Sequence, residues 1–271
     1  MKAMPRWMIR TLMAALMFGL TVAGSFAEAE PGAGEVSALV SPLQGPFQSM
    51  TADELFAKLL EQNRLRDLRL QRYSAVRTYN VASDKGKIYA EDVVRVEYRA
   101  PDHKTFVISS EKGSTLVRNL VLNRLIESES ETSSGQAHRD SSMTPANYEF
   151  NLLGEQNVGP YHCLVAEVTP RRMDKYLFEG RVWINTEDYA IVRIAGQPAK
   201  SLSFWITRAD FVRQYEKIGE FWFPAQDQTL VHMRVAGNKI LSIQHHDYVV
   251  NEDTNENGRT ITSENRATPT R

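Results

Sequence analysis

The chain contains a single cysteine, Cys163, which is the first candidate for a catalytic nucleophile. Cys163 stands in the run Tyr-His-Cys-Leu-Val-Ala at 161–166, whose aromatic and β-branched residues are typical of a β-strand. Neighbouring residues of a strand point to opposite faces of the sheet, so His162 is badly placed to activate Cys163. Because no Gly-x-Ser-x-Gly segment is present either, the sequence predicts no catalytic residue and a protein that is not an enzyme.

Two histidines near the C-terminus are the best candidates for metal ligands. A two-residue hairpin turn at Gly237-Asn238 pairs Val235 with Ile240, and this register puts His232 and His245 on one face. Zinc needs at least a third convergent ligand, which the pattern does not supply. One cysteine also excludes an internal disulfide and a Cys-based zinc or iron–sulfur site. We therefore predict no metal ion and no cofactor.

Paired carboxylates are the remaining candidates for acid–base chemistry. Glu91-Asp92 falls at a predicted strand start and Glu187-Asp188 at a predicted turn, positions whose usual partner is solvent. No glycine-rich phosphate loop accompanies them. The sequence therefore predicts a binding protein, and the elements that shape a binding surface matter more than any reactive group.

Length and composition restrict the kind of protein. The chain has 271 residues, with 32 Lys and Arg against 33 Asp and Glu, and a net charge of -1. This balance lacks the basic excess of a nucleic-acid-binding protein. Hydrophobic residues make up 42% and charged residues 24%, which excludes a mostly disordered or polytopic membrane protein.

The N-terminal segment 1–29 has the features of a cleaved signal peptide. Three basic residues precede the apolar run 12–23, and Ala27 or Ala29 ends a small-residue cleavage motif. An uncleaved anchor is the alternative, but the uncharged run 11–27 is only 17 residues long and marginal for spanning a bilayer. No cysteine stands at the end of the apolar run, where a bacterial lipoprotein would be acylated, so we expect a mature chain that is not a lipoprotein. We expect an exported protein of the bacterial periplasm.

One domain is expected between a flexible lead-in at 30–50 and a disordered polar tail at 252–271. Thr51 and Glu54 form a capping box that starts a helix running to about Asn63. A second amphipathic helix is predicted over 114–127, with Leu116 and Leu122 on its apolar stripe. A polar, Ser-rich excursion follows at 127–147 within the domain 51–251.

The rest of the domain alternates between apolar and polar residues in runs separated by turn residues, the pattern of antiparallel strands. About ten strands are predicted, at 71–83, 87–99, 104–110, 148–156, 161–169, 176–185, 190–197, 202–217, 220–235 and 239–251. The predicted fold class is therefore α+β, a large curved antiparallel β-sheet (an incomplete β-barrel) covered by about two helices.

Two helices are too few to cover ten strands, so part of an apolar sheet face is expected to remain open as a ligand cavity. Large aromatic side chains on the strands are the candidate ligand-binding residues, although each of them would equally suit a packed core. They are Trp183, Phe204, Trp205, Phe221, Trp222 and Phe223.

Two segments also resemble a known group. The strand, acidic turn and strand at 176–194, and the hairpins at 215–248 with Gly219-x-Phe221-Trp222-Phe223-Pro224, are similar to those of the outer-membrane lipoprotein-sorting (LolA/LolB-like) superfamily. The resemblance implies a half-barrel whose hydrophobic cavity holds acyl chains. It also implies a non-enzymatic periplasmic protein that binds or carries lipid or acylated lipoprotein partners in outer-membrane biogenesis, with transient contact with a membrane surface. The alternative is an envelope stress-sensing or protein-interaction module of the same fold.

Overall fold

The computed structural model describes residues 50–101, 103–123, 125–126, 142–174, 176–201, 204–235, 237–254 and 260–261. The predicted signal peptide, nearly all of the lead-in, most of the Ser-rich excursion and most of the tail lie outside these residues. Among the described residues, no helix combines the length and apolar character needed to cross a bilayer.

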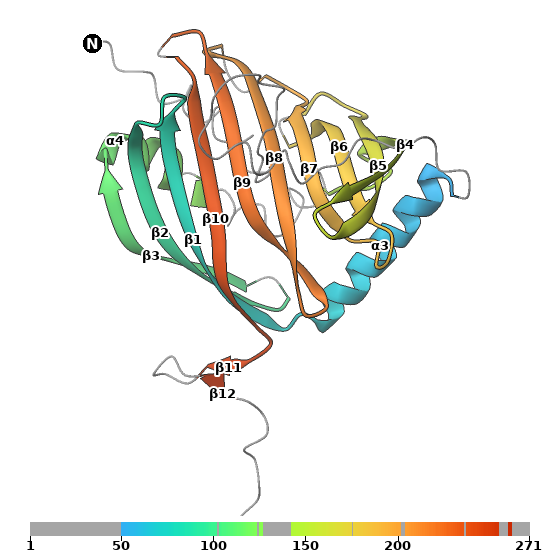
Figure 1. Cartoon of the computed structure of the whole chain (residues 1–271). Coiled ribbons are helices and arrows are strands. Elements are labelled where there is room, and N and C mark those ends of the chain that lie inside the picture. The colour runs from blue at the N-terminus through green and yellow to red at the C-terminus, as the bar shows by residue number, and fades with distance from the viewer. Residues whose placement is uncertain are drawn as a thin grey trace, which may run out of the picture.

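Ten strands form one open antiparallel sheet in the order β3-β2-β1-β10-β9-β8-β7-β6-β5-β4 (Figure 1). This confirms the predicted fold class and all ten predicted strands. β3 and β4 are the two edges, so the sheet does not close on itself. The strands are β1 (Arg72–Ser83), β2 (Ile88–Arg99), β3 (His103–Gly113), β4 (Tyr148–Val158), β5 (Tyr161–Pro170), β6 (Phe178–Asn185), β7 (Ile191–Pro198), β8 (Ile206–Ile218), β9 (Phe221–Met233) and β10 (Lys239–Val250). Two short strands in the tail, β11 (Asp253–Thr254) and β12 (Thr260–Ile261), pair with each other.

Helix α3 (Ala52–Arg69) begins at the predicted capping box. The Thr51 hydroxyl accepts from the Glu54 N–H at 3.2 Å, and the Glu54 carboxylate accepts from the Thr51 N–H at 2.8 Å. The helix continues past the predicted end at Asn63 to Arg69, because its last turns are tied to the sheet by the arginine contacts described below.

The second predicted helix differs from the expected amphipathic helix. A short α4 (Thr115–Val117) passes directly into a π-helical turn, η2 (Arg118–Leu122). The wider π turn breaks the 3.6-residue period on which the predicted stripe depended. As a result Leu122 is fully buried, but Leu116 is 67% exposed.

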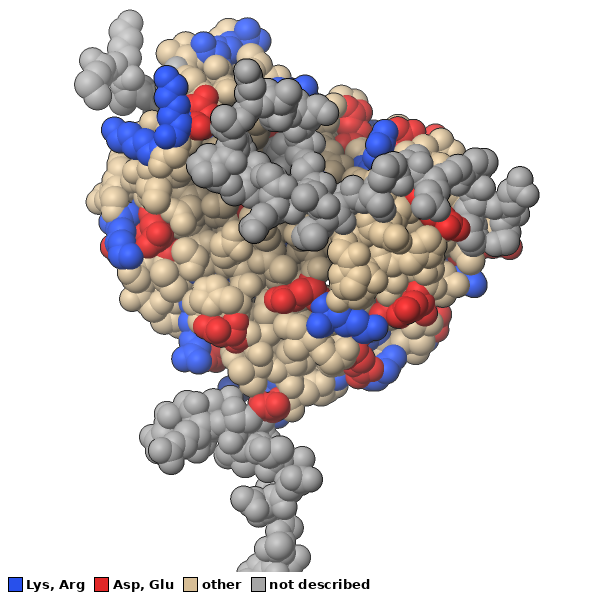
Figure 2. Space-filling view, viewed as in Figure 1, with Lys and Arg blue, Asp and Glu red and all other residues tan. Residues whose placement is uncertain are grey.

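Both helices pack on the same face of the sheet, which we call the helix face; the other is the open face. Alternating strand residues build an α3 cluster under α3 and a separate η2 cluster under η2. The α3 cluster holds Leu55, Phe56, Leu59, Leu164, Val182 and Phe211 among others, and the η2 cluster holds Tyr79, Val94, Val96, Leu122 and Leu241 among others. On the face seen in Figure 2, acidic and basic side chains are interspersed rather than gathered by sign.

Candidate ligand-binding site

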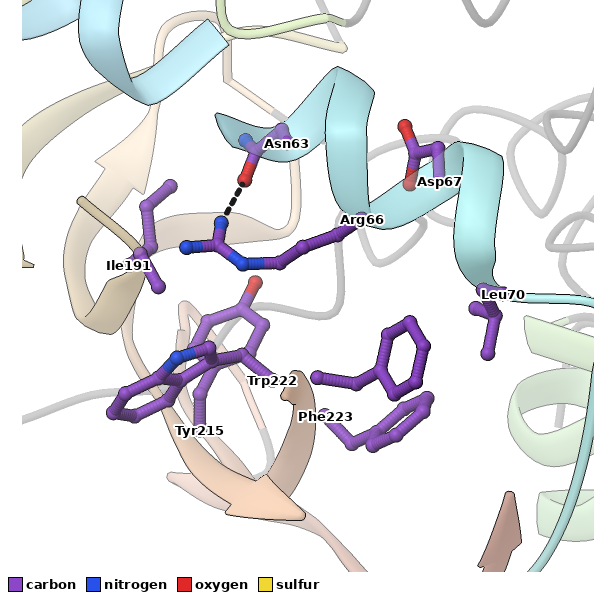
Figure 3. A pocket seen from close by; sticks show the side chains of 10 residues that line it. Asn63, Arg66, Asp67, Leu70, Ile191, Tyr215, Trp222 and Phe223 are labelled. Atoms are coloured by element: carbon purple, nitrogen blue, oxygen red, sulfur yellow. Dashed lines mark hydrogen bonds between the residues drawn. The ribbon is translucent and has the colours of Figure 1, made fainter. Parts of the chain in front are cut away.

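A pocket of about 190 Å³ lies between the C-terminal half of α3 and the β8–β9 hairpin (Figure 3). One wall comes from α3 and its cap, and the other comes from aromatic residues of β8 and β9. The lining residues are Asn63, Arg66, Asp67, Leu70, Ala190, Ile191, Tyr215, Phe221, Trp222 and Phe223. The pocket therefore brings together helix and strand residues about 150 positions apart in the chain.

Two arginines hold the α3 wall against the sheet. Arg69 in the last turn of α3 forms an ion pair with Glu220 in the β8–β9 turn. Arg66 donates to Asn63 Oδ1 at 3.0 Å and to the main-chain carbonyl of Asp188. Figure 3 shows the Arg66 side chain extending beneath α3 toward Asn63, above the rings of Tyr215 and Trp222. The α3 wall therefore contributes one basic and one acidic side chain to the pocket, Arg66 and Asp67.

Asp188, in the turn between β6 and β7, contacts residues from both walls of the pocket, Arg66 of α3 and Trp222 of β9. Its carboxylate accepts from Asn185 Nδ2 at 2.8 Å and from Trp222 Nε1 at 2.9 Å, and Lys217 Nζ lies 2.8 Å from Oδ2. Burial alone would raise the pKa of Asp188, but the hydrogen bonds from Lys217, Trp222 and Asn185 together lower it. Asp188 therefore stays ionised and holds the Trp222 ring in place.

The prediction that solvent is the main partner of the paired carboxylates is therefore wrong for Asp188. It is also wrong for Asp92, which is fully buried on the helix face, opposite Tyr79 on β1. Burial raises the pKa of Asp92, and the Arg118 guanidinium, 3.9 Å away, opposes this. In both cases tertiary packing brought partners from other elements.

The aromatic wall is continuous with rings on the neighbouring strands. Phe221 and Phe223 are buried, with ring centres 6.2 Å apart. Phe223 stacks on Tyr248 of β10 at 4.7 Å and lies 5.1 Å from Tyr73 of β1, which in turn stacks on Tyr98 at 5.3 Å. An apolar surface therefore runs from the pocket across the helix-face ends of β9, β10, β1 and β2.

The structure places the six predicted ligand-binding residues in three regions. Phe221, Trp222 and Phe223 line the pocket. Trp183 lies on the open face in a third cluster with Cys163, Val165 and Val192, and Trp222 also packs against this cluster. Phe204 and Trp205 lie in the loop before β8, at the opposite end of that strand from the pocket, where Phe204 is 72% exposed. Ligand binding by each of the six stays a prediction.

A buried polar cluster on the helix face was not predicted. Arg213 of β8 makes two hydrogen bonds to the carboxylate of Asp227 on β9, and His245 Nε2 of β10 lies 3.1 Å from Asp227 Oδ2. The cluster adjoins the pocket through Tyr215, whose ring centre is 5.9 Å from the Arg213 guanidinium. The sequence signal for this cluster was a titratable residue facing the helices on each of three strands. That signal can be recognised only when the register of the strands is known.

Burial and the contacts within this cluster determine the charge states of Asp227 and His245. Burial would raise the pKa of Asp227, but the adjacent Arg213 guanidinium and the hydrogen bond with His245 lower it. Burial lowers the pKa of His245, and the contact with Asp227 only partly opposes this. Asp227 is therefore charged and His245 neutral at pH 7. The arrangement neutralises one arginine inside the sheet rather than presenting a reactive group to the pocket.

The predicted histidine pair is not formed, because the register of the last hairpin differs from the prediction. β9 ends at Met233, and Lys239 pairs with Val231 and Ile240 with Leu230. A longer loop replaces the two-residue turn, since the Arg234 N–H is bonded to the Trp205 carbonyl. His232 and His245 consequently lie on opposite faces. The described residues contain no group of three or more potential metal ligands.

Cys163 is buried on the open face, and burial raises its thiol pKa to about 12. His162 points to the other face, where its ring contacts Glu155 and Asn157. The alternation argument against a Cys–His pair is therefore confirmed.

No protein-family model matches the sequence, and no curated protein sequence matches it. Solved structures similar to the chain include a DUF1329 family protein from Desulfovibrio piger, 14% identical, with a TM-score of 0.40 over 77% of this chain and 94% of that chain. A putative outer membrane lipoprotein-sorting protein domain from Vibrio parahaemolyticus is 12% identical, with a TM-score of 0.39 over 76% and 96%. A LolA superfamily protein from Nitrosomonas europaea is 9% identical, with a TM-score of 0.34 over 78% and 98%. The solved structures similar to this chain thus include lipoprotein-sorting proteins, the group that its two hairpin segments resemble in sequence.

Proposed function

We propose that this chain is a non-enzymatic binding protein of the bacterial periplasm that takes the apolar part of a lipid or of an acylated protein into the pocket beneath α3. The observation that carries the proposal is the aromatic wall of Tyr215, Phe221, Trp222 and Phe223 facing α3 across an open space. The export-signal features of residues 1–29 support the periplasmic location. No reactive group is needed for this function.

The size of the pocket limits what it can hold. At about 30 Å³ for each water-sized group, 190 Å³ accommodates about six methylene groups. Burying each one contributes about 0.8 kcal/mol, so the pocket alone supplies about 5 kcal/mol, close to the value for a millimolar complex. A longer acyl chain would gain affinity by continuing over the ring surface of Tyr248, Tyr73 and Tyr98.

The first test is uptake of a fluorescent fatty acid by the purified protein and by two variants of Asn63, which lines the pocket from α3. Asn63→Phe fills the space and should weaken binding at least tenfold. Asn63→Ala removes the same hydrogen bond to Arg66 without filling the pocket, and should bind like the parent. Equal uptake by both variants would exclude this pocket as the acyl site.

Contact with a membrane surface is proposed for the loop end, defined as residues 84–88, 199–201, 204–205, 234–235 and 237–238. The register places these segments together, because Ser83 pairs with Lys239 and Ile206 pairs with Met233. The Arg234 guanidinium lies 4.9 Å from the Phe204 ring, and its Nε donates to the Phe204 carbonyl, so the ring is held outward. The loop end combines exposed apolar residues with basic ones: Ile88, Phe204, Val235, Lys85, Lys87, Lys200 and Arg234.

Apolar and basic side chains together favour an anionic bilayer surface. Phe204→Ser should reduce co-sedimentation with phosphatidylglycerol vesicles severalfold. Leu68→Ser is the matched control, since Leu68 is similarly exposed but lies on α3, away from the loop end. Equal loss in both variants would remove the loop end from the proposal.

A protein-interaction module is the second candidate, favoured by the edge strand β3. Val107 and Ile108 are exposed on this strand, whose outer side lacks a neighbouring strand in the sheet. An extended segment of a partner could add to such an edge by main-chain hydrogen bonds. A Val107→Pro variant that loses a co-purifying protein but keeps fatty-acid uptake would favour this function over acyl binding.

A further inference from the structure

Arg193 is a buried cation without an acidic partner. It lies in β7 on the open face, paired with Trp183 on β6 and Gln214 on β8, and is 5% exposed. Among the described residues, no carboxylate lies within ion-pair distance of its guanidinium. Burial, with no opposing acid, lowers its pKa. Arg213, on the neighbouring strand β8, differs sharply because Asp227 neutralises it with two hydrogen bonds.

The contacts of Arg193 support its position but leave its donors unused. Its guanidinium lies 5.1 Å from the Trp183 ring, a cation–π contact that supplies no hydrogen-bond acceptor. Trp183 is itself fixed, since its Nε1 donates to Gln156 Oε1 at 2.6 Å. The Arg193 Nε is sealed from solvent with no hydrogen-bond partner, whereas the two Nη groups are not sealed. Burying a charge without a counterion or hydrogen-bond acceptors is strongly unfavourable, and a ligand that supplies both would remove this cost.

The Nη groups have room for a ligand. Arg193 and Trp183 line an open-face groove of about 550 Å³ formed by residues of β5 to β8. This volume falls within the range of about 300–1,000 Å³ that is typical of small-molecule sites. A group bound to Arg193 could therefore belong to a larger molecule.

The other charges of the groove are mostly satisfied. Asp210 is paired with Arg208 and lies 3.3 Å from His232 Nε2, and Glu179 accepts from Gln197 at 2.6 Å. Glu167 is opposite Arg181 on the neighbouring strand, two strands away from Arg193. Among the described residues of the groove, Arg193 is therefore the buried cation that lacks a counterion, whereas Arg181 is exposed to solvent.

We propose that the open-face groove binds an oxyanion, a phosphate or carboxylate group carried on a larger molecule, through the guanidinium of Arg193 stacked on Trp183. The planar guanidinium presents two parallel N–H donors, the geometry that such anions accept in bidentate form. The anion has two sources, a soluble phosphate or carboxylate compound and the headgroup of an anionic lipid. The site is on the opposite face from the α3 pocket and does not depend on the function proposed for that pocket.

Thermal unfolding of the exported protein, with and without anions, tests this site. Inorganic phosphate or acetate should raise the Tm of the parent above the value in sodium chloride of equal ionic strength. Arg193→Met should abolish that difference while leaving the Tm in chloride unchanged or higher, since it removes an unpaired buried charge. Arg95→Met is the matched control, an exposed arginine on the open face of β2 outside the groove, and should keep the anion-dependent shift.

Two results would overturn the proposal. One is the same Tm in phosphate, acetate and chloride for the parent, together with equal binding of parent and Arg193→Met to phosphatidylglycerol vesicles. The other is a lower Tm for Arg193→Met in chloride with an unchanged anion-dependent shift, which identifies a structural arginine. A shift with inorganic phosphate or acetate identifies a soluble ligand, and at least fivefold weaker vesicle binding by Arg193→Met without such a shift identifies a lipid headgroup. If Arg193→Met does not fold, Arg193→Lys provides the comparison, because it keeps the charge but loses the bidentate geometry and should lose most of the shift.

Discussion

Replacing Asp227 tests the buried polar cluster most directly, because that carboxylate serves two neighbours. It is almost completely buried, accepts two hydrogen bonds from Arg213, and lies 3.1 Å from His245 Nε2. Asp227→Asn keeps the shape but leaves the Arg213 charge uncompensated on the helix face. Removing one partner of a buried pair costs about 3–5 kcal/mol, a large share of the 5–15 kcal/mol typical of a domain.

The assay is urea unfolding of the parent, of Asp227→Asn, of Arg213→Met and of the variant carrying Arg213→Met with Asp227→Leu. We expect each single change to lower the free energy of unfolding by about 3 kcal/mol or more. The double change should cost much less than the sum, because the two variants remove each other's unpaired charge. Glu61→Gln is the control, since its ion pair with Arg64 is more than half exposed on both sides and its loss should leave the free energy of unfolding almost unchanged.

A loss below about 1 kcal/mol for Asp227→Asn would refute the reasoning, because it would mean that water already solvates the pair. Additive losses in the double variant would refute it in a different way. They would mean that each side chain stabilises the sheet through packing rather than through the other's charge.

Three further predictions concern other parts of the molecule. Burial lowers the pKa of His245 below its ordinary value of 6.5, so the folded state binds fewer protons than the unfolded state and stability should fall as pH drops below 6.5. His245→Gln should reduce this dependence of stability on pH, measured by urea unfolding at pH 7, 6 and 5. An unchanged dependence would assign it to other groups. Gly196→Ala would place a Cβ 2.2 Å from the Glu179 carbonyl oxygen of the adjacent strand and should lower the free energy of unfolding by about 2 kcal/mol or more. Gly86→Ala meets open space but has a φ of +78°, and should lower the free energy of unfolding by only about 1 kcal/mol. Equal losses would contradict the steric explanation. Thr51→Ala should lower stability by about 1 kcal/mol through loss of the capping box, measured against Thr115→Ala, and no difference between the two would show that α3 is held by packing alone.

The strands were predictable from the sequence because each carries a period-two pattern bounded by turn residues. The register of the last hairpin was not, because the Gly237-Asn238 signal suggested a two-residue turn while the chain uses Arg234 to bond the preceding loop. That single error changed the face assigned to His232 and concealed the inward pairing of Asp227 with His245.

The pocket was predictable only in part. Aromatic residues at 221–223 marked one wall, since such side chains on a strand must be covered by something. The other wall depends on α3 continuing beyond Asn63, and contacts with Glu220 and Asp188, more than 100 positions away, decide this. The missing counterion of Arg193 could not be predicted either. The alternation of strand residues assigns Arg193 to a face of the sheet but does not show whether an acidic residue lies beside it.

The α3 cluster and the η2 cluster divide the hydrophobic core of the sheet into two parts. The apolar residues of the first cluster end at Phe211 on β8, and those of the second resume at Leu241 and Ile243 on β10. Between them the middle of β9 presents Asp227 and Thr229 to the helix face, so apolar contacts join the halves only near one end of the strand, where Phe223 meets Tyr248 and Tyr73. We therefore expect the two halves to exchange their amide hydrogens as partly independent units, with different protection for strands over the α3 cluster and strands over the η2 cluster.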